Sequence, residues 1–512
     1  MGKRVHSMTV GDDEIKHLTR RQALLRAATV LTGTACSISV HLPEAPCNAL
    51  GERVGEVTPH SAIIHTRLTA QSDRNNRGYS FPFWTHSLSR EQRLTVRVPE
   101  GMTVADLEGA CPGKEGLVRL HHSRDPGVGN AKASDWVKAG FETDFTHQFQ
   151  LEGLNPETRY YYAVEMKALS DNEIRRGAIG SFRTAPLPER WTRVKFTAVT
   201  CQDYACRDHV GGYKTYESMT KLAPDFLLST GDSVYYDIDL PLATSVELAR
   251  FHWHRMYSQP SLVNFFRTAS GYWLKDDHDT FEDDDWPTRQ PQRVAPMTWA
   301  DLAPVFLEQV PMGPKPYRSL RWGRGIEIWL VDTREFRSPN PDPDGPNKTI
   351  WGAEQKAWLK KTLLASDAQF RVLVSPDCIV GPGGEPDRVH FKMPEGGADS
   401  QGDGGFAYEG REFRRWVREN ELTNLLVING DRHWQYHSVD PESGLHEFSC
   451  GPVADAHASD HPFDPKYHRF LRHKGGFIAV SLEGTEQRPQ LVVEHRDVEG
   501  TGVHQFVFTR AS

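Results

Sequence analysis

The sequence predicts an α/β core preceded by a β-rich region, in a chain of 512 residues. Between about residues 50 and 187, short alternating runs are separated by turn residues, which is typical of a β-sandwich. From residue 192 onward, continuously apolar runs of strand length alternate with helical patterns, which indicates a buried α/β sheet. We therefore expect a tail at 1–49, domains at 50–187 and 192–512, and a linker over Pro186–Trp191.

The first domain carries a turn motif near its end. Leu154-Asn155-Pro156 leads into the strand-like run Tyr160-Tyr161-Tyr162, which resembles the tyrosine corner of fibronectin-like sandwiches. Phe182–Thr184 then forms the last predicted strand. These features predict a fibronectin-like β-sandwich domain.

The second domain shows strands and helices in alternation. The predicted strands are Val194–Val199, Phe226–Ser229, Ile326–Val331, Val372–Val374 and Leu425–Ile428. The predicted helices are Val246–Tyr257, Gly352–Leu364 and Arg411–Glu419. The stretch from Gly476 to Arg510 alternates again, and we expect it to add strands to a sheet.

The N-terminus resembles a twin-arginine export signal, because Arg20-Arg21 precedes a short, weakly apolar stretch over 27–35. The alternative is a cytosolic amphipathic helix that contains this arginine pair. The signal predicts a periplasmic or extracellular protein and the twin-arginine export machinery as a partner. No run of about 18 apolar residues occurs, so we expect no membrane span in the mature protein.

The composition indicates a globular protein and argues against a nucleic-acid-binding protein or a disulfide scaffold. With 38% hydrophobic and 25% charged residues, the chain is typical of a globular protein. A net charge of −8 argues against broad binding of nucleic acid, and no specific nucleic-acid partner is expected. Seven cysteines without regular spacing do not form a disulfide scaffold, although a Cys201–Cys206 bridge stays an alternative.

Polar residues that could bind metal follow the predicted strands, where open α/β sheets place their sites. Cys201 follows the first strand, and its alternative role is a packed small hydrophobic residue. Asp232 follows the second strand after Gly231, and its two oxygens suit a carboxylate that bridges two cations about 4 Å apart. Tyr235 could supply a phenolate, or it could be a packing aromatic residue.

Two further segments complete the candidate site. Asp276–Asp285 is a strongly acidic run with one histidine, His278. Its carboxylates repel one another unless cations or solvent screen their charge. A solvated acidic loop is the alternative. Asp431 and His433 are two residues apart, so both side chains point the same way in an extended segment. Ser449–Pro452 follows another short strand and is expected to close the pocket wall.

Together these segments resemble the alkaline phosphatase D (PhoD-like) family of calcineurin-like metallophosphoesterases. The resemblance covers nearly the whole chain. It rests on these motifs: Thr200-Cys201-Gln202, Gly231-Asp232-x-x-Tyr235, Asp276-Asp277-His278-Asp279, Val331-Asp332-Thr333-Arg334-x-x-Arg337, Gly352–Leu359 and Gly430-Asp431-x-His433.

The resemblance implies a four-layer αββα sandwich and a mixed metal centre. It places Fe³⁺ on four ligands, namely Cys201, Asp232, Tyr235 and His433. It places Ca²⁺ beside the iron, on Asp277 and Asp431. Thiolate and phenolate donors suit a trivalent iron, and carboxylates suit Ca²⁺.

Two positions depart from the family pattern. Lys275 stands where many relatives have a tryptophan directly before the Asp-Asp-His motif. Asp283 lies in an acidic stretch where relatives often have asparagine, which leaves the second metal and the role of Asp283 open.

The hypothesis is a secreted phosphatase or phosphodiesterase in which a metal-activated hydroxide attacks phosphate mono- or diesters. His278 is expected to protonate the leaving oxygen or to orient phosphate, with Asp276 as a further catalytic residue. Arg334 either clamps phosphate or is a structural arginine paired to a carboxylate. The alternative functions are a catalytically silent binding module and another metal-dependent ester hydrolase such as a sulfatase. No Gly-rich phosphate-binding motif occurs at a strand–helix junction, so no nucleotide or organic cofactor is expected.

Overall fold

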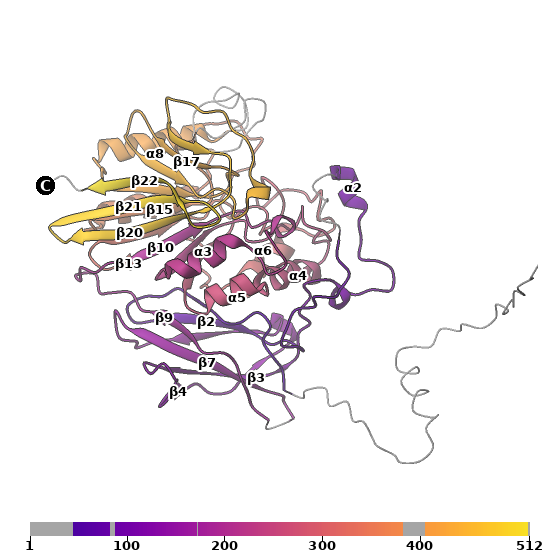
Figure 1. Cartoon of the computed structure of the whole chain (residues 1–512). Helices are drawn as coiled ribbons and strands as arrows, with labels where there is room; N and C mark the ends of the chain where they lie inside the picture. The colour runs from indigo at the N-terminus through magenta and orange to yellow at the C-terminus, as the bar shows by residue number, and fades with distance from the viewer. Residues whose placement is uncertain (1–44, 82–87, 171–172, 382–404, 510–512) are drawn as a thin grey trace, which may run out of the picture. The chain divides into compact units, whose positions relative to one another are not determined.

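The structure is a computed structural model that describes residues 45–81, 88–170, 173–381 and 405–509. Contacts divide the chain into the units Met1–Pro43 and Glu44–Ser512, and every described element belongs to the second unit (Figure 1). The predicted export signal lies outside the described residues, so it stays a prediction together with its export machinery.

The largest sheet has nine strands in the order β22-β21-β20-β10-β11-β12-β1-β2-β6. Their bounds are β1 Arg53–Gly55, β2 Ala62–Arg67, β6 Thr146–Leu151, β10 Lys195–Val199, β11 Phe226–Thr230, β12 Ser270–Leu274, β20 Phe477–Thr485, β21 Arg488–Arg496 and β22 Gly502–Thr509. Strands β10, β11 and β12 are mutually parallel. Strand β20 pairs antiparallel with β10, next to which it is labelled in Figure 1. The C-terminal stretch therefore adds strands, as predicted.

The predicted N-terminal domain contributes strands to this same sheet. Strand β1 runs parallel to β12, with Gly55 opposite Gly271. Strands β1, β2 and β6 precede the predicted linker in the sequence, and β10–β12 follow it. All six nevertheless belong to one hydrogen-bonded sheet. The boundaries at 187 and 192 stay predictions.

A second sheet has seven strands in the order β13-β14-β15-β16-β18-β17-β19. Their bounds are β13 Arg318–Trp322, β14 Ile326–Leu330, β15 Phe370–Ser375, β16 Leu425–Asn429, β17 Gln435–Val439, β18 His446–Ser449 and β19 His468–Arg472. Strands β14, β15, β16 and β18 are parallel, so their carboxyl ends lie at one edge.

A third, six-stranded sheet belongs to the N-terminal region. Its strands are β3 Gly116–Ser123, β4 Lys132–Ala133, β5 Val137–Ala139, β7 Arg159–Lys167, β8 Arg175–Arg176 and β9 Gly180–Arg183. The hydroxyl of Tyr160 accepts a hydrogen bond of 2.9 Å from the backbone N–H of Asn155, the local contact expected of a tyrosine corner. The fibronectin-like arrangement as a whole stays a prediction.

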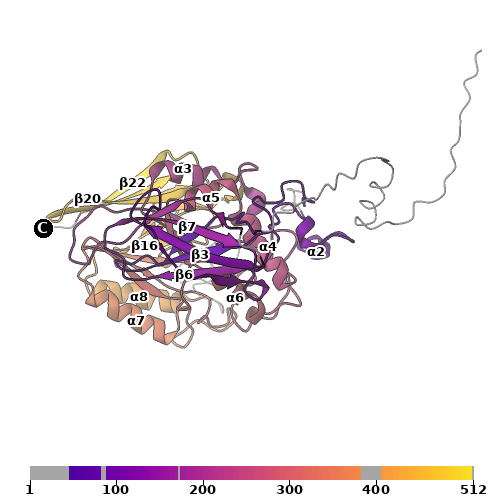
Figure 2. The ribbon, with the colours of Figure 1, turned by 90° about the horizontal axis from the view of Figure 1, so that it is seen from below.

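Helices flank the two larger sheets. Their bounds are α2 Arg90–Thr95, α3 Lys214–Leu222, α4 Val246–Tyr257, α5 Pro260–Phe266, α6 Trp299–Gln309, α7 Gly352–Ala365 and α8 Ala407–Glu419, with short 3-10 turns η2 Val104–Asp106, η3 Phe141–Thr143, η4 Tyr204–Cys206 and η6 Asp455–His457. Helices α7 and α8 lie on one side, and α3 and α5 lie on the other (Figure 2). Within the described residues, no helix is long and apolar enough to cross a membrane.

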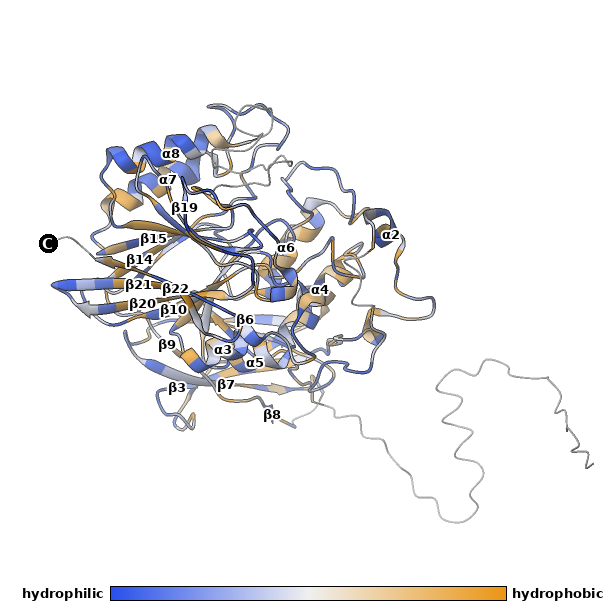
Figure 3. Cartoon of the chain, turned by 45° about the horizontal axis from the view of Figure 1, so that its top comes forward, coloured by the Kyte–Doolittle hydropathy of each residue, from blue (hydrophilic) through white to orange (hydrophobic). Residues whose placement is uncertain are grey.

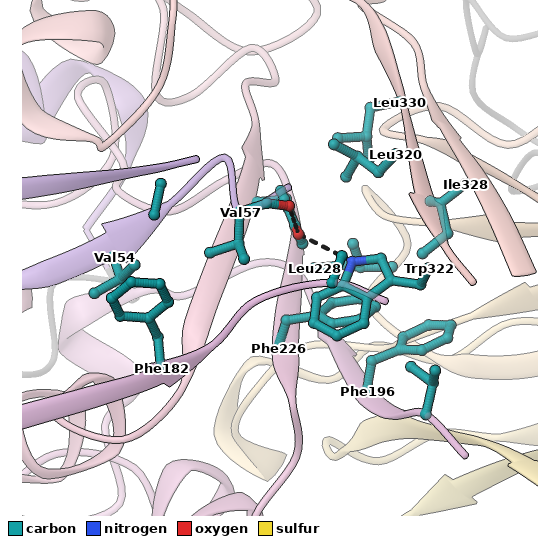
Figure 4. Close-up of a cluster of buried hydrophobic side chains, with 14 of the residues drawn as sticks. Val54, Val57, Phe182, Phe196, Phe226, Leu228, Leu320, Trp322, Ile328 and Leu330 are labelled. Atoms are coloured by element: carbon teal, nitrogen blue, oxygen red, sulfur yellow. Dashed lines mark hydrogen bonds between the residues drawn. The ribbon is translucent and has the colours of Figure 1, made fainter. Parts of the chain in front are cut away.

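The main hydrophobic core lies between the nine-stranded and seven-stranded sheets. Phe196 and Phe226 from the first sheet pack in one cluster with Trp322 and Ile328 from the second (Figure 4). Separate clusters join the other faces of these sheets to α3–α6 and to α7–α8. Each buried Phe or Leu stabilises the fold by about 1.5–3 kcal/mol. The fold is thus a mixed α/β fold with several sheets, and the four-layer description stays a prediction.

Candidate metal centre

Most of the predicted ligands lie at an edge where parallel strands end. Cys201, Asp232 and Asp277 follow the carboxyl ends of β10, β11 and β12, respectively. Asp431 follows the carboxyl end of β16 in the other sheet. An isolated bridge between Thr200 and Pro452 links the loops of the two sheets. The site is therefore built from both sheets, at the place where strand-end loops meet.

Two glycines permit this close approach. A Cβ atom on Gly231 would lie 2.5 Å from Cβ of Asp276, and Gly231 has a φ of +105°. A Cβ atom on Gly430 would lie 2.6 Å from Oγ1 of Thr200 and from the carbonyl of Thr230. A larger side chain at Gly231 would separate two neighbouring loops of the nine-stranded sheet, and one at Gly430 would separate the loops of the two sheets.

The backbone is strained at three of the predicted ligands. Cys201, Asp232 and Asp431 have φ values of 53°, 54° and 62°, in the left-handed region that costs a non-glycine residue about 1–3 kcal/mol. Such residues persist only where the surrounding structure holds them, and they concentrate at functional sites. Three of the residues that the sequence singles out are therefore among the non-glycine residues with positive φ.

The structure brings acidic and histidine side chains together in two groups. One group contains Asp232, Asp277 and His278, and the other contains Asp276, Asp277 and Asp431. Within each group the ligand atoms lie within 4.8 Å of one another. Asp277 belongs to both groups, so the arrangement can hold two neighbouring cations that share a carboxylate.

Cys201 and Tyr235 lie beside the first group. Sγ of Cys201 is 3.4 Å from Oδ2 of Asp232, and the hydroxyl of Tyr235 donates to the same oxygen at 3.3 Å. Both side chains are fully buried. Cys201 and Cys206 are free thiols, so the alternative of a disulfide between them is wrong. The packing alternatives for Cys201 and Tyr235 leave their contacts with Asp232 unexplained.

His433 lies next to a histidine that the sequence analysis missed. The ring of His433 packs against the ring of His457 at a centroid distance of 4.1 Å. Nδ1 of His457 is 3.4 Å from the carbonyl oxygen of Cys201, and its ring lies 5.3 Å from that of Tyr235. Among the described residues, neither Cys201 nor His433 is a member of the two compact groups, so their ligand roles stay predictions.

His278 is held by a buried carboxylate. Nδ1 of His278 lies 2.6 Å from Oδ1 of Asp237, and the ring packs on Tyr235 at 4.3 Å. Asp237 also pairs with Arg293 at 2.6 Å. Arg293 pairs in turn with Asp283 at 3.0 Å. Nε2 of His278 is the ring nitrogen that remains for the site, and it lies 3.8 Å from Asp283.

Arg334 forms ion pairs with the acidic residues of the site. Its side chain is 0% exposed, and Nε donates to Oδ1 of Asp276 at 2.5 Å. Its other nitrogens lie 3.6–3.7 Å from three more carboxylates, those of Asp277, Asp285 and Asp377. These contacts are the ones expected of the structural alternative, an arginine paired to carboxylates, and the phosphate clamp stays a prediction.

Burial and neighbouring charges shift the pKa values of three residues of the site. Burial, followed by the carboxylate of Asp277, raises the pKa of Asp232 well above its usual value. Burial and Asp232 likewise raise the pKa of the Cys201 thiol. Burial alone would lower the pKa of His278, but Asp237 and Asp277 outweigh it and raise that pKa well above its usual value. Bound cations would favour the anionic forms of the acids.

The residues fit a metal centre. Oδ1 of Asp232 is buried and has no hydrogen-bond partner among the described residues, which leaves it available to a cation. Carboxylates, imidazoles, a thiol and a phenol together form a donor set for metal ions. The positions of Asp277 and Asp431 agree with a second cation beside the first.

Several residues of the site escaped the sequence analysis. Asp237 lies two positions after Tyr235 in the same loop, but nothing in the local pattern pairs it with His278. His457 follows the predicted pocket wall at Ser449–Pro452 by five positions, as a single histidine without a partner motif. Arg293 follows the acidic run but carries no spacing signal.

The fold and the site define an α/β protein with a carboxylate-rich metal centre at the joint edge of two sheets. The family model described as PhoD-like phosphatase matches residues 196–473, and the PhoD-like phosphatase N-terminal domain matches residues 39–186. The chain belongs to the PhoD-like phosphatase family.

Individual proteins are also similar to this chain. Alkaline phosphatase D of Bacillus subtilis (strain 168) is 22% identical over 329 residues, which are 56% of this chain and 52% of that protein. The chain thus matches about half the length of this curated relative. A solved structure of PhoD has a TM-score of 0.64 at 17% identity, covering 90% of this chain and 89% of that chain. The purple acid phosphatase PPD1 from yellow lupin (Lupinus luteus) seeds has a TM-score of 0.58 at 11% identity, covering 90% of this chain and 74% of that chain.

Proposed function

We propose that this chain is a secreted metal-dependent phosphatase or phosphodiesterase, acting at a mixed two-metal centre of the iron and calcium type. The observation that carries the proposal is the pair of ligand groups that share Asp277 where both sheets end. Family membership supports phosphate esters as the substrate class. The four-layer sandwich, the fibronectin-like domain and twin-arginine export belong to the same proposal.

In this proposal one cation takes Asp232 with Cys201, Tyr235 and His433. Asp277 and Asp431 would hold the other cation. Bound cations neutralise charge on the phosphoryl oxygens and lower the pKa of water. Support comes from the 3.4 Å and 3.3 Å contacts of Cys201 and Tyr235 with Asp232.

The protein's own residues supply orientation and a proton. Asp237 accepts from Nδ1 of His278, which fixes the ring and leaves Nε2 to protonate the leaving oxygen. Arg293 keeps 21% exposure beside His278 and is the better candidate than Arg334 for a cation that faces phosphate. Arg334 offsets the charge of Asp276, which thereby acts as a positioning residue.

Turnover of a phosphomonoester, a phosphodiester and a sulfate ester by the purified protein tests the proposal, with an Asp232→Asn variant as the comparison. We expect hydrolysis of a phosphate ester and loss of both bound metal and turnover in the variant. Turnover of the sulfate ester alone would favour the sulfatase alternative. Absence of turnover in a fully metal-loaded protein would favour the silent binding module.

A further inference from the structure

A pocket of about 140 Å³ lies beside α8, within the described part of the chain. Its lining combines five cationic side chains with only two carboxylates, those of Asp440 and Glu442. The cations are Arg411, Arg414, Arg415, Arg418 and Lys466. This concentration of positive charge contrasts with a chain whose net charge is −8.

The helix places its four arginines on one face. They stand at positions i, i+3, i+4 and i+7 of α8, a spacing that aligns side chains along one side of an α-helix. Phe413 and Val417 on another face are buried in the core between α8 and its sheet. The helix is predominantly hydrophilic (Figure 3), and burial of its apolar face leaves Arg415 and Arg418 exposed, whereas Arg414 is buried.

The carboxylates leave positive charge in the pocket. Arg414 forms the base, where it donates to the carbonyl of Ile379 at 2.6 Å and lies 3.3 Å from Asp440. Oδ2 of Asp440 also accepts from the N–H and hydroxyl of Ser443 at 2.8 and 2.6 Å, so the turn already uses this carboxylate.

The two outer arginines are weakly held or unpaired. Arg418 is 3.5 Å from Glu442, with 49% and 78% of the two side chains exposed, and an exposed pair of this kind contributes little in water. The guanidinium of Arg415 is exposed and has no hydrogen bond or ion pair to any residue that the structure describes. Lys466 lies 4.7 Å above the ring of Tyr467. Arg415 and Arg418 are therefore available to an anion.

The pocket is separate from the metal centre. Asp440 and Glu442 belong to the turn that joins β17 to β18, and the N–H of Asp440 donates to the carbonyl of Leu445 at 2.9 Å. This turn lies at the amino end of β18. The metal centre lies at the carboxyl ends of the strands parallel to β18, which is the opposite edge of the sheet.

We propose that this pocket is a binding site for a phosphate-type oxyanion, held by the guanidinium groups of Arg415 and Arg418 and by the ammonium group of Lys466. A planar guanidinium donates two parallel hydrogen bonds to two oxygens of one phosphate. The ligand is either free phosphate or a phosphate within a longer chain, because both present the same oxygens. The inference does not require the chain to be a hydrolase.

Calorimetric titration of the metal-free full chain with inorganic phosphate at low salt tests the site. The metals are removed with a chelator because the carboxylates of the metal centre then repel phosphate. Phosphate binding at the metal centre therefore does not add to the binding measured for the pocket. We expect saturable binding that weakens at least about tenfold in Arg415→Ala/Arg418→Ala, since two charge-assisted contacts are lost. The matched control is Arg190→Ala/Arg193→Ala, which removes two arginines with 65% and 77% exposed side chains that pair loosely with glutamates. The control should bind phosphate like the wild type.

A second variant tests whether the alanine variant loses affinity only because it misfolds. Arg415→Lys/Arg418→Lys keeps both charges but loses the guanidinium geometry, so its affinity should fall between those of the wild type and the alanine variant. Titration with tripolyphosphate distinguishes free phosphate from phosphate within a longer chain as the ligand. Equal affinities identify free phosphate as the ligand, and an affinity for tripolyphosphate about tenfold higher or more, lost in the same variants, identifies linked phosphates. Absence of saturable binding by the wild type, or equal binding by the alanine variant, would overturn the proposal.

Discussion

Oδ1 of Asp237 lies 2.6 Å from Nδ1 of His278, with both side chains buried. This contact fixes one nitrogen of the imidazole and thereby determines which nitrogen faces the site. The same carboxylate pairs with Arg293 and accepts from the N–H of Asp283 at 3.1 Å. Asp237 therefore links His278, Arg293 and the loop of Asp283.

Replacing Asp237 with asparagine should lower kcat by about 10–100-fold, as the loss of an orienting partner typically does. KM should change much less, because Asp237 is buried and does not contact substrate. Steady-state kinetics, with metal content measured on the same samples, checks this expectation. Asp301→Asn, which alters an exposed helix cap, is the control. An unchanged kcat would contradict the orienting role.

Arg334 should matter for stability rather than for substrate binding. Its guanidinium is the common partner of Asp276, Asp277, Asp285 and Asp377, and removal of one partner from a buried ion cluster costs about 3–5 kcal/mol. Arg334→Met should therefore lower the free energy of unfolding by this order. Arg293→Met should instead raise KM with a smaller loss of stability. Chemical denaturation and kinetics on both variants distinguish the two arginines, and the reverse pattern would restore the phosphate clamp to Arg334.

Asp279 joins the two loops that carry Asp232 and Asp277. One of its oxygens accepts from the N–H of Asp276 at 2.7 Å, and the other accepts from the N–H of Ser233 at 2.9 Å. Each hydrogen bond to a buried carboxylate contributes about 1.5–3 kcal/mol. Asp279→Ala should thus destabilise the fold by about 3 kcal/mol or more and reduce metal affinity, measured by thermal unfolding with and without added metal. Retention of wild-type metal affinity would show that the two loops keep their positions without this contact.

The regular elements could be predicted because their patterns are local. Predicted strands such as Phe226–Ser229 and predicted helices such as Val246–Tyr257 match β11 and α4 closely. The pairing of β1 with β12 could not be predicted, because it joins residues more than 200 positions apart through backbone hydrogen bonds that leave no sequence pattern. That pairing explains why the N-terminal region shares a sheet with the core.

The residues of the candidate site likewise include some that local sequence patterns predict and some that they do not. Asp232, Asp277 and Asp431 were predictable because each follows a strongly apolar strand. Asp237, Arg293 and His457 were not, because their roles depend on contacts across loops. Arg334 was predictable as part of a motif, but its burial among carboxylates is visible only in the packed structure.

Glu52 should make the stability of this protein depend on pH. Burial raises the pKa of Glu52 from 4.5 to about 7, although a hydrogen bond of 3.2 Å from Asn48 opposes the shift. The folded state therefore holds this proton more tightly than the unfolded state does. The resulting stabilisation is complete below about pH 4.5 and is lost as the pH rises through about 7, a change of about 3 kcal/mol.

A glutamine at position 52 keeps the acceptor for Asn48 but cannot ionise. The stability of Glu52→Gln relative to the wild type should therefore increase between about pH 4.5 and pH 7 and stay constant at higher pH. Urea denaturation of both proteins over this pH range measures the difference in unfolding free energy. The control is Glu100→Gln, which alters an exposed carboxylate. A stability difference that does not vary with pH would mean that Glu52 ionises in the folded protein as readily as in the unfolded chain.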